Sequence, residues 1–105
     1  MHIIITRPIE DCLELIKNLK IIHHTVTYLP LININKITNN YIDFKNYKGI
    51  IFTSANAIKF LDTKNISKKI DCFCVGETTE KKAKYFGFYN AISAGGNVDA
   101  LIELI

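Results

Sequence analysis

The sequence is poor in cysteine and contains no long apolar run. Its three cysteines are an odd number, which argues against a framework of disulfide bonds. No apolar stretch reaches the roughly 18 residues that a membrane-spanning helix needs, and the opening residues do not form an apolar export segment. We therefore expect a cytoplasmic protein without a membrane partner.

Nucleotide-binding loops are also missing. The chain has five glycines, and neither GxGxxG nor GxxxxGK[ST] occurs. Gly95 and Gly96 precede a predicted helix, but without a further glycine and a lysine they indicate a turn. The predicted strand ends carry no acidic cluster, which disfavours a receiver-like domain that binds Mg²⁺ and accepts a phosphoryl group.

Cysteine and histidine do not occur at the spacing of a zinc site. Cys72 and Cys74 would lie on one face of a predicted strand, where such a pair is more often packed core than metal ligand. His23 and His24 are adjacent, so in a strand they would face opposite ways. We expect no metal and no cofactor.

Positive charge is only slightly in excess. The formal net charge is +3, and the lysines are scattered among carboxylates. Proteins that bind nucleic acids concentrate their positive charge more strongly. We expect no nucleic-acid partner, whereas an anionic small molecule suits this balance.

Short apolar runs alternate with amphipathic helical patterns along the chain. Hydrophobic residues make up 49% of the sequence, which is enough for a packed core. The β-branched runs predict strands buried on both faces, and the β-α alternation predicts an α/β fold with parallel, flavodoxin-like sheet units. Strands are expected over residues 2–6, 25–29, 49–53, 71–75 and 89–93, and helices from Pro8, from Ser54, over residues 78–86 and from Asn97.

Apolar residues at helical spacing mark the inner face of the predicted helices. The last helix has no stop signal, such as a closing glycine or a basic final turn, so we expect the chain to be cut short relative to its fold. The expected inner-face residues are Cys12, Leu15, Ile16 and Leu19 in the first helix, Ala57, Ile58, Phe60 and Leu61 in the second, and Val98, Leu101, Ile102 and Ile105 in the last.

A polar, asparagine-rich segment divides the chain. It includes Asn39 and Asn40 and favours turns, and one short helix is expected in it, around Tyr41, Phe44 and Tyr47. We expect an opening β-α-β unit over residues 1–33, a connector over 34–48 and a partial second α/β lobe over 49–105.

Candidate site residues follow three of the predicted strands. Ligands of open parallel sheets bind at the carboxyl ends of strands, and hydroxyls, amides and helix N-terminal N–H groups suit carboxylates or phosphates. Ordinary helix capping explains the same residue types, so spacing alone leaves both interpretations open. The candidates are Thr6 and Arg7 after the first strand, Thr53, Ser54, Ala55 and Asn56 after the third, and Gly76 and Thr79 after the fourth.

Six segments form an ordered series through nearly the whole chain. The longest reads YKGIIFTSANAI over residues 47–58. It is preceded by IIITRP at 3–8 and LPLI at 29–32, and followed by CVGETT at 74–79, GF at 87–88 and AGG at 94–96. In this series the chain resembles the uroporphyrinogen-III synthase family.

The resemblance implies an enzyme of porphyrin and haem biosynthesis. The family has two α/β lobes joined by a two-stranded linker. Its substrate is hydroxymethylbilane, a linear tetrapyrrole with eight carboxylates, which loses its hydroxyl and closes to uroporphyrinogen III with inversion of the terminal pyrrole. The family's reaction is that of a cyclising hydro-lyase without a cofactor, and its catalysis comes largely from positioning.

The resemblance also implies roles for the candidate residues. Thr79 is expected to be catalytic, by donating a hydrogen bond near the leaving hydroxyl. The other candidates, with backbone N–H groups, are expected to bind substrate carboxylates: Thr6, Arg7, Thr53, Ser54, Ala55, Asn56 and Gly76.

Roughly the second half of the family's chain has no counterpart here, including a cleft tyrosine. We expect an incomplete two-lobed fold whose activity requires a complementing second-half polypeptide or a homo-oligomer. The alternative is a non-catalytic remnant or small α/β binding module that self-associates through its unfinished sheet edge.

Overall fold

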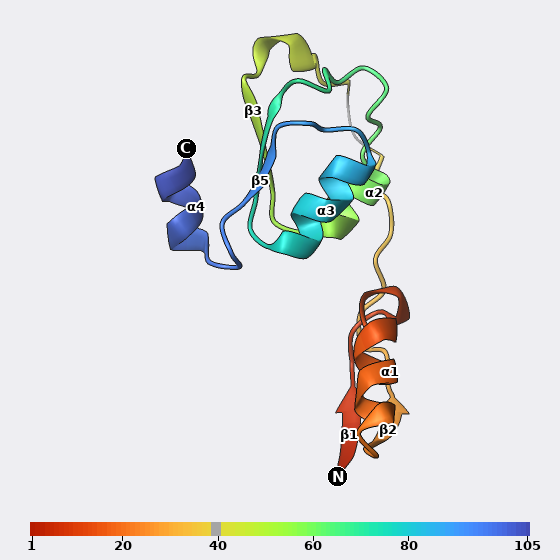
Figure 1. Cartoon of the computed structure of the whole chain (residues 1–105). Helices are drawn as coiled ribbons and strands as arrows, with labels where there is room; N and C mark the ends of the chain where they lie inside the picture. The colour runs from red at the N-terminus through yellow and green to blue at the C-terminus, as the bar shows by residue number, and fades with distance from the viewer. Residues whose placement is uncertain (39–40) are drawn as a thin grey trace. The chain divides into compact units, whose positions relative to one another are not determined.

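The computed structural model describes residues 1–38 and 41–105, which form two compact units, Met1–Lys36 and Ile37–Ile105. Each unit contains one parallel sheet with helices packed against it (Figure 1). The predicted α/β class with parallel strands is confirmed. The turn expected at Asn39 and Asn40 lies outside the described residues.

The first unit is a β-α-β crossover. Strand β1 (His2–Ile5) pairs in parallel with β2 (Thr25–Tyr28), and helix α1 (Leu13–Ile21) connects them. Within the described part of this unit, Ile5 and Cys12 are the buried apolar residues. So small a core implies marginal stability for the unit by itself.

Two local predictions for this unit were wrong. The chain forms a 3₁₀ turn, η1 (Ile9–Asp11), before α1, so Pro8 does not open the α-helix, and Leu15 on the expected inner face is exposed. His23 and His24 precede β2, in agreement with the strand expected over residues 25–29, and His23 has a φ of 64°. This left-handed residue reverses the chain after α1, a role that sequence periodicity does not reveal.

The second unit contains a three-stranded parallel sheet in the order β3-β4-β5. Ile50 pairs with Cys72, and Cys72 with Ala91, so side chains of the three strands form rows across the sheet. The elements are η2 (Phe44–Asn46), β3 (Gly49–Phe52), α2 (Ala55–Phe60), β4 (Asp71–Cys74), α3 (Glu77–Tyr85), β5 (Ala91–Ser93) and α4 (Val98–Leu104).

The core of this unit lies between one face of the sheet and helices α2 and α3 (Figure 1). Cys72 and Cys74 point into it from β4, as the strand alternation predicts, and both are fully buried. Gly87 has a φ of 90° and ends α3, as expected of a C-terminal glycine. The core residues are Phe52, Ile58, Ile66, Ile70, Cys72, Cys74, Ala83, Phe88 and Ala91.

The prediction that the strands are buried on both faces was wrong for β1 and β3, whereas in β4 the outer-face Phe73 is half-buried. Ile51 and Ile92 lie in one cross-strand row with Phe73, on the face opposite the core, and they are 52% and 46% exposed. In the first unit Ile4 is exposed in the same way. Apolar runs predict burial on both faces only if helices cover both, and here the core-forming helices of each sheet cover one.

Helix α4 lies on the other side of the sheet from α2 and α3 (Figure 1). It contacts β4, and its Leu101 is buried outside the core cluster. The predicted Asn97 cap is confirmed, since its side-chain oxygen accepts a hydrogen bond from the Asp99 N–H at 2.8 Å. The other expected inner-face residues of this helix, Val98, Ile102 and Ile105, are exposed.

Candidate site at the carboxyl ends of the strands

The strand ends of the second unit bring most of the predicted site residues to one edge of the sheet. Strands β3 and β4 are adjacent and parallel, so the loops after Phe52 and Cys74 leave the sheet at the same end. One loop carries residues 53–56 and the other carries Gly76 and the start of α3. This is the edge at which open parallel sheets bind ligands.

Ser54 is the N-cap of α2. Its hydroxyl oxygen accepts a hydrogen bond from the Asn56 N–H at 3.2 Å, so the capping interpretation is confirmed for this residue. Capping uses a lone pair and leaves the hydroxyl proton free to be donated to a ligand. Thr53 is exposed, whereas Ser54, Ala55 and Asn56 are half-buried.

Gly76 caps α3 through its backbone. Its carbonyl accepts hydrogen bonds from the N–H groups of Thr79 and Glu80, both at 3.1 Å. Its φ of −130° is open to any residue, and no atom lies within 4 Å of the place a Cβ would take. The fold therefore does not require glycine here, and a ligand can approach the backbone closely.

Thr79, the predicted catalytic residue, lies on the inner face of α3. It is only 6% exposed and shares that face with the buried Ala83. Only a small part of its side chain is thus open to a ligand at the sheet edge. Packing on the inner face of α3 is a structural role that differs from the helix capping that the sequence left open.

Thr6 and Arg7 lie in the first unit, directly after β1. Both are exposed, and the Thr6 carbonyl accepts a hydrogen bond from the Leu31 N–H at 3.1 Å. Their side chains are open to a ligand at the carboxyl end of this two-stranded sheet. The two units thus present candidate residues at equivalent strand ends.

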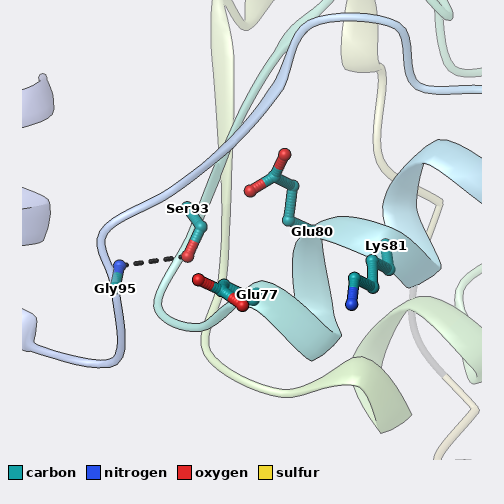
Figure 2. Close-up of a pocket in the computed structure, with 5 residues that line it drawn as sticks. All are labelled: Glu77, Glu80, Lys81, Ser93 and Gly95. Atoms are coloured by element: carbon teal, nitrogen blue, oxygen red, sulfur yellow. Dashed lines mark hydrogen bonds between the residues drawn. The ribbon is translucent and has the colours of Figure 1, made fainter.

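A hollow of about 330 Å³ opens beside the N-terminal end of α3, where β4 and β5 end (Figure 2). The Ser93 hydroxyl, at the end of β5, accepts a hydrogen bond from the Gly95 N–H at 3.0 Å and fixes the turn that forms one wall. Helix α3 supplies the opposite wall. The lining residues are Glu77, Glu80, Lys81, Ser93 and Gly95.

The hollow is not built to receive an anion. Glu77 and Glu80 bring two carboxylates to its wall, and Lys81 is the one cation among its lining residues. Glu80 forms an ion pair with Lys84 one turn further along α3, which offsets its charge. A polycarboxylate therefore finds better partners at residues 53–56 and Gly76 than in this hollow.

Sequence reasoning did not select Lys81, Glu80 or Ser93 as site residues. The spacing of Glu77, Glu80 and Lys81 places them on one helix face and could have grouped them. Ser93 ends the strand that the sequence predicted over residues 89–93, so the same strand-end argument could have selected it.

The buried thiols of Cys72 and Cys74 resist ionisation and are therefore unreactive. Burial, followed by the neighbouring Cys74, raises the pKa of Cys72 to about 11, and burial, followed by Glu80, raises the pKa of Cys74 to about 11. Thiols with such values are poor nucleophiles and poor metal ligands at neutral pH. In the described residues 1–38 and 41–105 no three or more His, Cys, Asp or Glu side chains cluster as metal ligands would.

No helix within the described parts of the chain combines the length and apolar character needed to cross a bilayer. No curated protein matches the chain. The family model described as uroporphyrinogen-III synthase HemD matches residues 14–105, which include both loops of the second unit but leave out Thr6 and Arg7. With most of its length matched, the chain belongs to the uroporphyrinogen-III synthase family.

Proposed function

We propose that this chain takes part in the uroporphyrinogen-III synthase reaction, in which hydroxymethylbilane loses its hydroxyl as water and closes with inversion of the terminal pyrrole. The observation that carries the proposal is the family match over residues 14–105. Family membership shows ancestry and fold, and the site geometry supplies the groups for binding.

The octacarboxylate substrate binds at the loop of residues 53–56 and at Gly76. Thr53 and Ser54 supply hydroxyl donors, Asn56 an amide, and Gly76 a backbone that a carboxylate can approach without a side chain in the way. In the first unit, taken by itself, Arg7 offers a guanidinium that suits a carboxylate. These groups recognise carboxylates by hydrogen bonds and need no metal.

The reaction needs positioning more than it needs acid or base groups. Hydroxymethylbilane closes by itself to isomer I, so the synthase must hold the terminal ring in the geometry that gives isomer III. Binding several substrate carboxylates at fixed donors restricts the flexible chain. Thr79 is the proposed donor to the leaving hydroxyl, although its side chain as a whole is only 6% exposed.

The test is a coupled synthase assay. Hydroxymethylbilane is generated in place by the preceding enzyme, this chain is added, and the oxidised porphyrin isomers are separated. An excess of isomer III over a control without the chain supports synthase activity. Isomer I alone contradicts activity of this chain by itself and favours the non-catalytic binding module.

Substrate binding is tested separately with uroporphyrin III, a fluorescent octacarboxylate. Its titration into the chain is expected to saturate, and Gly76→Ala is expected to weaken it, because the added methyl group occupies open space above the backbone. Tyr89→Phe, which changes an exposed residue just before β5 at the opposite end of the sheet, is the comparison variant. Equal binding by the parent and Gly76→Ala would remove Gly76 from the proposed site.

A further inference from the structure

The turn that follows β5 is tied to the loop that carries Gly76. The Gly96 N–H donates a hydrogen bond to the carbonyl of Val75, the residue before Gly76. Gly96 has a φ of 95°, a left-handed conformation that favours glycine, and no atom lies within 4 Å of the place a Cβ would take. The backbone conformation that makes this bond, and not a lack of space, therefore favours glycine at this position.

The bond from Gly96 marks a reversal in the backbone of Val75. In a regular strand the N–H and the carbonyl of one residue point to the same side. The Val75 N–H donates to the Phe52 carbonyl of β3 at 3.1 Å, whereas the Val75 carbonyl accepts from Gly96, which follows β5. Strand β4 lies between β3 and β5, so the two polar groups of Val75 bond to opposite neighbours.

The direction of the Val75 carbonyl sets that of the Gly76 N–H. In a trans peptide the carbonyl of one residue and the N–H of the next point in opposite directions, and the described residues contain no cis peptide. Because the Val75 carbonyl is held towards the turn after β5, the Gly76 N–H is directed away from that turn, to the side on which residues 53–56 follow β3. Within residues 1–38 and 41–105 this N–H has no hydrogen-bond acceptor.

We propose that Gly96 is a positioning residue for carboxylate binding, because its hydrogen bond to the Val75 carbonyl aims the unpaired Gly76 N–H at the side of residues 53–56. The inference rests on the proposed function, in which this edge of the sheet binds substrate carboxylates. It names the Gly76 N–H as a donor, and Gly96, which supplies no group to the ligand, as the residue that orients this donor. A carboxylate suits the donor, since hydrogen bonds to ionised acceptors are the stronger ones.

The first arm of the test needs no ligand. In the isotope-labelled full chain, after correction for intrinsic rates, the Gly96 amide is expected to exchange with solvent about tenfold more slowly than the Gly76 amide, because only the Gly96 N–H is hydrogen-bonded. Equally fast exchange at both amides would mean that the tie to Val75 does not hold in solution. Equally slow exchange would mean that the Gly76 N–H already has an acceptor. Either result overturns the inference.

The second arm adds butanetetracarboxylate, an aliphatic polycarboxylate without the ring current of a porphyrin. The Gly76 amide proton is expected to shift downfield on titration, because its N–H gains a carboxylate acceptor. Gly96→Ala is expected to abolish this shift and to weaken binding about tenfold, since alanine disfavours a φ of 95° and the Val75 carbonyl is released. D-Alanine at Gly96, introduced by chemical ligation at Cys74, favours a positive φ and should restore both.

Gly87→Ala is the matched control. Gly87 has a φ of 90° at the end of α3, which is the opposite end of the sheet from Gly76, and a Cβ there meets only ordinary contacts with Lys68. The same substitution thus strains a similar backbone conformation away from Val75, and it should leave the Gly76 shift and the affinity unchanged. Equal losses for Gly87→Ala and Gly96→Ala would mean that Gly96 acts only through the stability of the unit, which overturns the inference.

The outcomes separate this inference from the proposed function. Shifts at residues 53–56 without a shift at Gly76 support the carboxylate site but overturn the role of Gly96, and so does a Gly76 shift that persists in Gly96→Ala. A Gly76 shift that depends on Gly96 supports the inference even where the coupled assay yields isomer I alone. The absence of a shift at all of these residues contradicts both the inference and carboxylate binding at this edge.

Discussion

The catalytic role proposed for Thr79 conflicts with the burial of its side chain. A hydrogen-bond donor to the leaving hydroxyl needs the Thr79 hydroxyl, whereas packing beside Ala83 needs mainly its methyl group. In a preparation that forms isomer III, Thr79→Val is expected to lower the rate about tenfold, the value of about 1.4 kcal/mol for one hydrogen bond, while Thr79→Ser keeps most of it. The rates are measured in the coupled assay.

The opposite ranking of the two variants' activities would indicate a structural role for Thr79. If Thr79→Ser loses more activity than Thr79→Val, and loses stability in parallel, the side chain acts through packing. Urea unfolding of both variants supplies the stability comparison.

The two core thiols are expected to make the free energy of unfolding depend on pH in the alkaline range. The pKa values of Cys72 and Cys74 rise from 9.0 to about 11 in the folded chain. Between these values the unfolded chain has lost thiol protons that the folded chain keeps, so the free energy of unfolding falls as pH rises from 9 towards 11. Below pH 9 the thiols should not contribute to the pH dependence of the free energy of unfolding, because they are protonated in both states.

The comparison is a double variant, Cys72→Ala with Cys74→Ala, because lysines and tyrosines titrate in the same pH window. Urea midpoints under reducing conditions should fall more steeply with pH in the parent than in this variant. Equal slopes would mean that the folded thiols ionise as readily as unfolded ones.

At the scale of elements, α4 depends on one side chain for its attachment. Leu101 is 5% exposed, whereas its neighbour Ile102 is 69% exposed. Leu101→Ala is expected to cost about 2–5 kcal/mol or to release the helix, and Ile102→Ala to stay within about 0.5 kcal/mol. Urea unfolding and amide exchange along α4 measure both effects.

The matched pair makes the result specific, because both changes remove apolar atoms from the same helix. Similar losses for the two variants would mean that Ile102 is also covered in solution. That outcome would indicate a further partner over the exposed side of α4.

Sequence reasoning reached the elements because each has a local cause. Helix caps at Ser54 and Asn97 and the left-handed Gly87 bound helices through contacts within a few residues. The left-handed turn at His23 was not among the predictions, because it depends on fitting α1 to β2.

At the scale of the whole molecule, the two units differ in how much they bury. Ile5 and Cys12 form the small core of the first unit, whereas the second buries a contiguous cluster around Phe88 and Ile58. We expect backbone amides of β1 and β2 to exchange faster than those of β4, because less apolar burial opposes local opening. Residue-resolved hydrogen exchange on the full chain measures this.

Exchange rates in β1 as slow as those in β4 would contradict the expectation. They would indicate that the first unit is stabilised by contacts beyond its own residues. Ile5→Ala tests whether the first unit depends on its own core. If it does, the variant should speed exchange in β1 and β2 while leaving exchange in β4 unchanged.

The sequence by itself determined the α/β class, the parallel strands, the positions of most helices and the strand-end segments that the family match supports. These follow from alternation, capping and turn residues, which act over short distances. Tertiary structure alone decided that Thr79 is buried, that Ile51 and Ile92 are exposed, and that α4 crosses to the other face of the sheet. Those outcomes depend on which helix covers which face, and a strand's sequence records its preference for burial but not the identity of the element that buries it.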